Sequence, residues 1–247
     1  MHSAENSFKI LTSVDSTNNY AMGMIRNGSA KHGTAWFSYE QTHGKGRRGN
    51  TWKTEKGKNI ILSIAVTTGF LTLSQQFHLS LAVSLACSDF FKKYAGDKTK
   101  IKWPNDIFWN DRKAGGILIE NVIKGNNWQW AVIGIGINVN QTEFNLHAVF
   151  KPVSLKQITG KDFNVLDLAK ELHQAVMTRY DELQNNRFEK MLFEYNQYLF
   201  GLNKRIKLKK EDIIFETTVK EVSSQGKLIT TDITEREFDF DEVEWVR

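Results

Sequence analysis

The sequence predicts an α+β protein in which a region of alternating strands and helices is followed by a small all-β region. The first observation is that apolar residues switch between strand-like runs and helical spacing up to about Tyr198. The second is that only short strand-like runs follow Gly201. The third is that 247 residues, 40% of them hydrophobic, can bury a sizeable core. We therefore expect two domains, residues 1–200 and 201–247.

The first elements are defined by their caps and their apolar runs. Ser16 is placed to cap a helix at its N-terminus, and Gly28 is placed to end that helix after Asn27. The run at 59–67 is almost continuously apolar, which indicates a buried strand. The predicted elements are strands at 8–11, 34–40 and 59–67 and a helix over 16–27.

The middle of the chain predicts a long core helix followed by three close strands and two more helices. Phe77, Leu81, Leu85 and Phe90 recur near helical spacing and mark one buried face. Turn residues at 110–111 and 125–127 separate the strands as hairpins. The predicted elements are a helix over 75–94, strands at 107–109, 114–123 and 128–139, and helices over 165–183 and 187–198.

The C-terminal segment predicts a β-barrel of about 45 residues. Its apolar runs are short, and Gln225-Gly226 provides a turn between two of them. From Lys204 onward it carries 9 cations and 11 acids, which does not favour nucleic-acid binding. The predicted strands are 205–208, 213–222, 227–230, 237–240 and 243–246.

Composition excludes several classes of protein. The single cysteine, Cys87, lies in an apolar pattern, so an intrachain disulfide and a cysteine metal cluster are excluded and a buried thiol is expected. The six histidines form no metal-ligand pattern. Residues 1–6 lack the apolar core of a signal peptide, and no 18-residue apolar run predicts a membrane helix. A cytoplasmic protein without a membrane segment is expected.

The most informative segment is Gly44-Lys45-Gly46-Arg47-Arg48-Gly49. It matches G-x-G-x-x-G, but no helical stripe follows it and no acid lies about 20 residues on, so a Rossmann fingerprint is not supported. Glycines and cations together instead favour a loop that presents backbone N–H groups and guanidinium groups to an anion. A solvated basic loop is the plain alternative.

The charge of the chain is concentrated in this loop. The chain has a net charge of +5, and residues 41–58 alone contain six cations and one acid. Such concentration favours one small anion, such as a phosphate, over a broad nucleic-acid surface. A localisation signal or nucleic-acid patch remains the alternative reading of a short basic run.

Four further clusters combine polar residues, glycines or proline, and each also has a purely structural explanation. Residues 15–18 group hydrogen-bonding side chains at a helix start, where capping alone explains Ser16. Residues 102–106, Lys-Trp-Pro-Asn-Asp, form an extended bend or an ordinary strand entry. Residues 112–116 place Lys113 close to two glycines. Lys113 is then either a solvated lysine of a hairpin or a residue near a bound ligand. Residues 134–138 alternate glycine with isoleucine, as a packed strand or as the floor of a binding site.

Taken in order, these motifs resemble those of biotin–protein ligases (biotin–[acetyl-CoA-carboxylase] ligases). The resemblance is strong over residues 8–140 and looser in the C-terminal region. It implies an α+β fold with a mixed-sheet biotin/lipoate ligase-type catalytic domain and an SH3-like β-barrel. The motifs that carry it are Ser16-Thr17-Asn18, Gln41 with residues 44–49, Lys102-Trp103-Pro104-Asn105-Asp106, Lys113 with Gly115-Gly116-Ile117-Leu118-Ile119-Glu120, and residues 134–138.

The resemblance implies a two-step reaction with ATP and biotin as substrates and Mg²⁺ as cofactor. Biotin is activated as biotinyl-5′-adenylate and then transferred to a lysine of a biotin carboxyl carrier protein. Ile117 and Ile119 are expected to wall the thiophane ring. The implied catalytic residues are Lys113, Arg47 and Asp106, with Asp106 also a candidate Mg²⁺ ligand. The implied biotin contacts are Ser16, Thr17, Asn18, Gln41, Gly44, Lys45, Trp52 and Gly116, and the implied adenylate contacts are Gly46, Arg47, Arg48, Asn105, Lys113, Gly134 and Asn138.

The chain departs from the family pattern at two loop positions. Family loops commonly read G-R-G-R-R-G-R, whereas this chain has Lys45 and Asn50, so one planar fork and one cation are lost. The sequence also begins at the catalytic region, so we expect a short enzyme without a DNA-binding domain and without specific DNA binding. A monomer or a homodimer is compatible with the sequence.

Two alternative functions stay open. A lipoate–protein ligase would share the fold, but such enzymes prefer an R-R-x-S-G-G-G loop and lack the Trp-Pro-Asn-Asp run. A non-catalytic nucleotide- or RNA-binding module would bind polynucleotide and would show no biotin dependence of ATP turnover.

Overall fold

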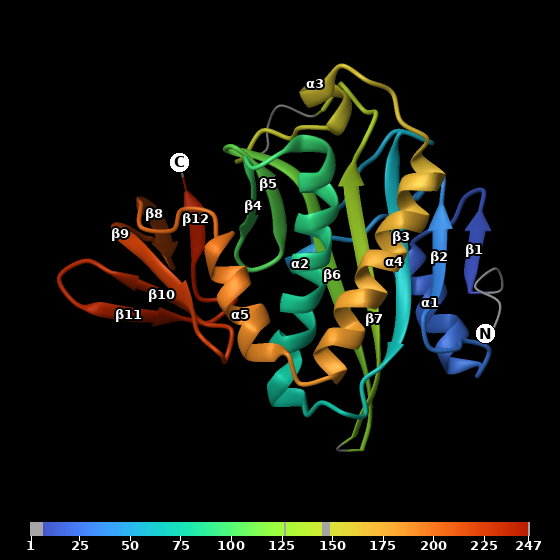
Figure 1. Ribbon diagram of the computed structural model, residues 1–247, viewed down its shortest axis with the longest axis horizontal. Coiled ribbons are helices and arrows are strands. Elements are labelled where there is room, and N and C mark those ends of the chain that lie inside the picture. Colours follow the sequence, from blue (N-terminus) through green and yellow to red (C-terminus); the bar gives the residue numbers. More distant parts are fainter. Residues whose placement is uncertain (1–6, 126, 145–148, 247) are drawn as a thin grey trace.

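The computed structural model describes residues 7–125, 127–144 and 149–246, which form two β-sheets and the helices packed on them (Figure 1). The larger sheet has the strand order β1-β2-β3-β7-β6-β5-β4. It is mixed, because β1 runs parallel to β2 while the other neighbouring strands are antiparallel. Its strands are β1 (Phe8–Leu11), β2 (Thr34–Ser38), β3 (Asn59–Thr67), β4 (Thr99–Lys102), β5 (Asp106–Trp109), β6 (Arg112–Lys124) and β7 (Asn127–Asn138).

Helices cover both faces of this sheet. On one face Ala21 of α1 packs with Trp36, Ala65 and Val132 in a small apolar cluster. The other face carries the main core beneath α2 and α4, because alternate strand residues point to opposite sides. The helices are α1 (Thr17–Arg26), α2 (Gln76–Ala95), α3 (Leu155–Thr159), α4 (Val165–Gln184) and α5 (Phe188–Gln197).

The second sheet is antiparallel and packs beside α5 at the end of the larger sheet that carries β4 (Figure 1). Trp103 reaches into it, where its Nε1 donates to the carbonyl of Gly226 at 2.9 Å and its ring packs on Phe240. Apolar side chains of both sheets belong to one hydrophobic cluster, while a division into two domains at residue 201 stays a prediction. The strands are β8 (Arg205–Lys210), β9 (Ile213–Val222), β10 (Leu228–Thr231), β11 (Glu235–Phe238) and β12 (Glu244–Val246).

The α+β class and the mixed sheet are confirmed, and most predicted elements lie where the patterns placed them. Two were missed. β4 is only four residues long and half lysine, and α3 is a single turn closed by a capping box of Ser154 and Gln157. β11 lies two residues earlier than predicted, and Asn126 of the predicted 125–127 turn lies outside the described residues.

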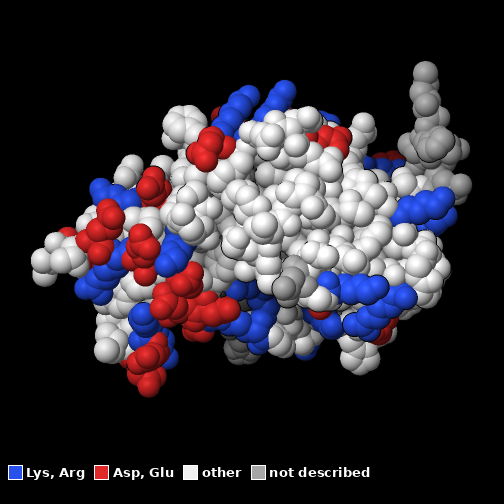
Figure 2. All heavy atoms as spheres, turned by 90° about the horizontal axis from the view of Figure 1, so that it is seen from below, with Lys and Arg blue, Asp and Glu red and all other residues white. Residues whose placement is uncertain are grey.

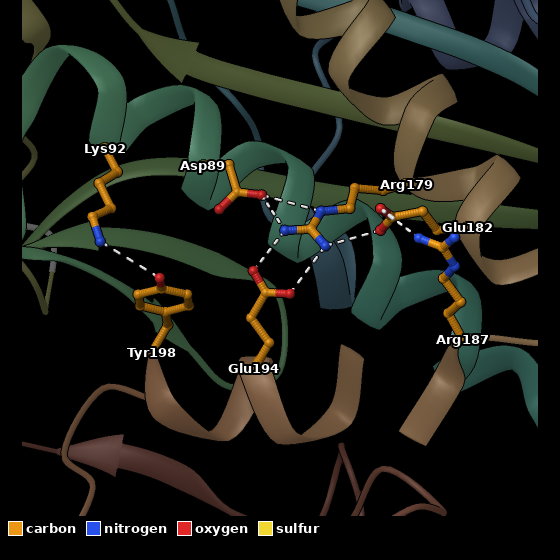
Figure 3. A network of polar contacts seen from close by, with 7 residues as sticks. All are labelled: Asp89, Lys92, Arg179, Glu182, Arg187, Glu194 and Tyr198. Atoms are coloured by element: carbon orange, nitrogen blue, oxygen red, sulfur yellow. Dashed lines mark hydrogen bonds and ion pairs between the residues drawn. The ribbon is translucent and has the colours of Figure 1, made fainter. Parts of the chain in front are cut away.

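Arg179 joins α2, α4 and α5 through ion pairs (Figure 3). From α4 its guanidinium donates to Asp89 on α2 and to both carboxylate oxygens of Glu194 on α5. Its side chain is only 16% exposed. Burial alone would lower the pKa of Arg179, but the hydrogen bonds that it donates to Glu194 and Asp89 raise it overall. The guanidinium therefore remains charged and ties α2, α4 and α5 together.

Replacing Arg179 by leucine should lower the free energy of unfolding by about 3 kcal/mol, because Asp89 and Glu194 would be left half-buried without their cation. Guanidinium chloride denaturation measures this. Arg187→Leu is the control, since the Arg187 side chain is 56% exposed and lies 3.7 Å from Glu182. It should change stability by no more than about 0.5 kcal/mol. Equal losses in both variants would contradict a special role for Arg179.

Candidate functional site

A cavity of about 680 Å³ lies where the basic loop, the β6–β7 hairpin and the second sheet meet. Its walls combine the N-terminus of α1, the glycines of β6 and β7, and the bend before β5. The structure thereby brings together segments more than 200 residues apart. The predicted site residues that line it are Ser16, Thr17, Asn18, Gln41, Lys45, Gly46, Arg47, Arg48, Trp52, Asn105, Asp106, Lys113, Gly116 and Gly134.

Glycines form the floor of the cavity. Gly116 of β6 pairs with Gly136 of β7, so two neighbouring positions on one face lack side chains. A Cβ atom at Gly136 would lie 2.5 Å from Cε2 of Trp52, and one at Gly134 would lie 2.4 Å from Oδ1 of Asn18. Trp52 and Asn18 therefore occupy the space that the glycines leave. Both the packed-strand and the ligand-floor interpretations of the Gly-Ile alternation therefore stay open, since Gly134 and Gly136 line the cavity and also make room for side chains of the protein.

A buried polar cluster closes one end of the cavity. Ser16 caps α1, and Gln41 Oε1 accepts from the backbone N–H of Thr17 at 2.7 Å and from its hydroxyl at 3.0 Å. Ser63 Oγ lies 2.7 Å from Thr17 Oγ1 and 2.6 Å from Asn18 Oδ1. These fixed donors and acceptors suit a small neutral group that has both N–H and C=O. Sequence reasoning missed Ser63, whose signal is a lone hydroxyl in an apolar strand.

The other end of the cavity gathers cations around Asp106. Nζ of Lys113 lies 2.6 Å from Asp106 Oδ1, and Nζ of Lys102 lies 4.0 Å from Oδ2. Arg47 donates to Oδ1 of Asn105 at 3.4 Å. Lys102, Lys113 and Arg47 outnumber their carboxylate partners Asp106 and Asp241, so this end of the cavity keeps an excess of positive charge and can accept an anionic group.

Lys102 was quoted within a motif but was not predicted as a site residue. It is 7% exposed, and the rings of Phe108, Phe150 and Trp245 lie 5.5, 5.0 and 5.1 Å from its Nζ. Burial lowers the pKa of Lys102 to about 8; Lys113 and Arg47 add to this effect, and Asp106 opposes it. The Lys102 amine is therefore only partly charged at and above pH 8, where an approaching anion would raise its pKa and increase its charge.

Three predicted contacts lie elsewhere. Asn138 is behind the cavity wall, where its Nδ2 donates to the carbonyls of Lys113 and Val153 at 3.3 and 3.2 Å. Gly44 holds Trp52 instead of lining the cavity, because a Cβ atom there would lie 2.3 Å from the Trp52 carbonyl oxygen. Of the two isoleucines expected to wall the thiophane ring, Ile117 lines the main cavity, whereas Ile119 lines only a second cavity beside α2.

The second sheet adds cavity residues that the sequence did not indicate. Phe240, Val243, Glu244 and Trp245 line the same cavity as Lys113. The long gap in sequence leaves no local pattern that connects them to the basic loop. Val149 and Phe150 were missed for the same reason.

The cations of the basic loop repel one another less than the composition of the loop suggests, because several of them lie beside carboxylates. Lys45 lies 3.8 Å from Glu120, Lys56 lies 3.2 Å from Glu40, and both arginines face acids of the second sheet. Four of the six cations of residues 41–58 thus have a carboxylate partner. Nε1 of Trp52 is buried and has no hydrogen-bond partner within the described part of the chain.

Among the described residues, no group of three or more His, Cys, Asp or Glu side chains is placed to hold a metal ion.

Cys87 is buried in α2, as predicted, and burial raises the pKa of its thiol. No helix within the described ranges is long and apolar enough to cross a membrane.

Comparison with known proteins identifies the family. The bifunctional ligase/repressor BirA of Escherichia coli is 32% identical over 221 residues, which cover 81% of this chain and 66% of that protein. The biotin–[acetyl-CoA-carboxylase] ligase of Paracoccus denitrificans is 35% identical over 53% of each chain. The chain spans just under two thirds of the length of the ligase/repressors that it matches, 66% of the Escherichia coli protein and 63% of a Bacillus subtilis relative.

Solved structures agree on the fold. The biotin protein ligase from Aquifex aeolicus, in complex with biotin and ATP, superposes with a TM-score of 0.82 at 23% identity, covering 98% of this chain and 99% of that one. The sequence model of the biotin/lipoate A/B protein ligase family matches residues 10–138, just over half of the chain. The chain therefore belongs to the biotin/lipoate A/B protein ligase family.

Proposed function

We propose that this chain is an ATP-dependent biotin–protein ligase. The observation that carries the proposal is one cavity with a neutral polar cluster over a glycine floor at one end and three cations at the other. Biotin has a matching division, since it has a neutral ureido ring at one end and a carboxylate at the other. The names of the related ligases support biotin as the acyl substrate.

Biotin binding is assigned to the polar cluster and its surroundings. The ureido ring would exchange hydrogen bonds with Ser16, Thr17 and Gln41, which line the cavity beside the glycine floor. Trp52 lies on Gly136 and would wall the rest of the ring system. The carboxylate then extends toward Lys113, whose Nζ lies 5.8 Å from the centre of the Trp52 ring.

The first reaction step joins two anions. A carboxylate oxygen of biotin attacks the α-phosphorus of ATP, and the bond from that phosphorus to the oxygen bridging to the β-phosphate breaks, so pyrophosphate leaves with the electron pair. Lys113, Lys102 and Arg47 offset the negative charges of the carboxylate and the triphosphate, which would otherwise repel each other. Because Asp106 holds Lys113 and Lys102 in place before the reaction, these two amines stabilise the transition state more than the separated substrates.

Asp106 is assigned an orienting role in this step. One of its oxygens holds Lys113 at 2.6 Å and the other faces Lys102. Mg²⁺ would enter with the phosphates of ATP, which commonly supply most of its non-water ligands, and Asp106 would be a single additional ligand. Among the described residues, no group of three or more His, Cys, Asp or Glu side chains forms a protein-held metal site here.

The second step transfers the biotinyl group to an amine. The lysine nitrogen of an acceptor attacks the carbonyl carbon of the mixed anhydride, AMP leaves, and the nitrogen loses a proton. We assign the acceptor as a biotin carboxyl carrier domain, which agrees with the name of the Paracoccus denitrificans relative. A lipoate ligase remains the rival within the same family.

The proposed function is tested by incubating the chain with biotin, MgATP and a biotin carboxyl carrier domain and recording the mass of the carrier. The proposal predicts addition of one biotinyl group to one lysine, and none when ATP is omitted. A parallel reaction replaces biotin by lipoate. Modification by lipoate and not by biotin, or no modification of the carrier in either reaction, would refute the proposal.

Lys113→Ala should lower the rate of biotin-dependent ATP–pyrophosphate exchange by roughly 10²–10³, since one fixed donor at the reacting centre is lost. The fold should be intact, because the side chain lines a cavity and is partly exposed. Lys53→Ala is the matched control: Lys53 belongs to the same basic segment but is exposed and does not line the cavity, so exchange should change only a fewfold. Equal losses would show that Lys113 merely adds to a diffuse positive field.

ATP binding should take up protons above pH 8 through Lys102. The pKa of this amine is lowered to about 8, so at pH 8.5 part of it is neutral, and nearby phosphates raise the pKa again. Calorimetry at pH 8.5 in two buffers of different ionisation enthalpy should detect the uptake. It should vanish in Lys102→Met, and Lys102 should contribute none at pH 6.5, where it is already charged. Equal uptake in both proteins would assign the proton to another group.

Gly136→Ala should weaken biotin binding at least tenfold, because the new methyl group would displace Trp52 from the floor. Isothermal titration with biotin measures this. Gly23→Ala on α1 is the control, since a Cβ atom there meets nothing within 4 Å. Undiminished affinity in Gly136→Ala would mean that Trp52 does not shape the biotin site.

A further inference from the structure

The two arginines of the basic loop are bound by acids of the second sheet. Nη2 of Arg47 and Nε of Arg48 lie 3.0 and 3.1 Å from the same oxygen of Asp241, and Nη1 of Arg48 lies 2.7 Å from Glu244. The ring of Phe240 supports Arg47 at 5.7 Å. Acidic and basic side chains gather over the end of the molecule formed by this sheet, while the centre of the same face is almost uncharged (Figure 2).

These contacts connect the cavity to the surface. Arg47, Arg48 and Glu244 all line the main cavity. The side chains of Asp241 and Glu244 are 73% and 61% exposed, whereas those of Arg47 and Arg48 are 27% and 36% exposed. The carboxylates therefore approach the arginines from the solvent side. Ion pairs of this exposure are weak and can exchange for a more highly charged partner.

The backbone conformation of Arg48 indicates that the two carboxylates hold this residue in place. It has φ 53° and ψ 36°, in the left-handed region that costs energy for a residue with a side chain. The guanidinium of Arg48 contacts both carboxylates, which offset that cost. Without these contacts, Arg48 would lower its free energy by returning to a backbone conformation with negative φ.

We propose that Asp241 and Glu244 form an anionic latch that holds Arg47 and Arg48 when no nucleotide is bound and gives them up to its phosphates. The latch makes the second sheet a positioning element for the loop. It rests on the proposed function only for the identity of the anion, since the contacts themselves do not depend on it. A triphosphate outcompetes two exposed carboxylates because it carries more negative charge and its charges are closer together.

The test compares Asp241→Asn/Glu244→Gln with Asp239→Asn/Glu242→Gln. Both pairs remove two negative charges from the same segment, but the partners of Asp239 and Glu242 are Lys227 and Lys210, not the loop arginines. Without any nucleotide, amide hydrogen exchange over residues 44–52 should be several-fold faster in the latch variant than in the wild type. The control variant should exchange as the wild type does.

Affinity for MgATP supplies the second measurement. The latch variant should bind MgATP several-fold more tightly than the control variant at low salt, because no carboxylate competes for the arginines. The difference should disappear near 1 M salt, where the pairs are screened.

Unchanged hydrogen exchange in the latch variant would overturn the proposal, and so would weaker MgATP binding than in the control. If the wild type binds no ATP, the proposed function fails, and hydrogen exchange without nucleotide still decides whether the latch holds the loop.

Discussion

The site depends on the absence of side chains at three glycines of the β6–β7 hairpin. Gly116 and Gly136 face each other across the two strands, and Gly134 continues the same face. A single methyl group at Gly136 or Gly134 would overlap Trp52 or Asn18. The glycines therefore fix where the tryptophan lies and where the polar end of the cavity begins. Because these strands are central in the sheet, their positions are set by pairing on both sides and not by the loops.

A second constraint is electrostatic. An enzyme that brings a carboxylate to a triphosphate needs several cations in one place, and those cations repel one another in its absence. In this chain, carboxylates reduce the repulsion by forming ion pairs with the cations. Asp106 pairs with Lys113, and Asp241 and Glu244 pair with the loop arginines. Burial among aromatic rings reduces the repulsion further, because it lowers the pKa of Lys102 to about 8 and so leaves part of this amine neutral above pH 8. The positive charge is thus present where it is needed without a large cost to folding.

Local patterns predicted the fold well wherever an element was long. The 20-residue helices α2 and α4 and the long strands β6 and β7 appeared within a few residues of their predicted bounds. β4 and α3 were missed because four or five residues carry too little periodicity. The motifs led to most of the cavity, since glycines beside cations leave a sequence signal. Phe240 and Trp245 left none, because their role arises only when the second sheet docks on Trp103.

The central claim is that this cavity activates biotin with ATP. ATP–pyrophosphate exchange measured with biotin, with lipoate and with neither tests it most directly, since it detects adenylate formation without an acceptor. The account predicts exchange that requires biotin and is not supported by lipoate. Exchange with lipoate alone, or no exchange with either acid, would contradict it.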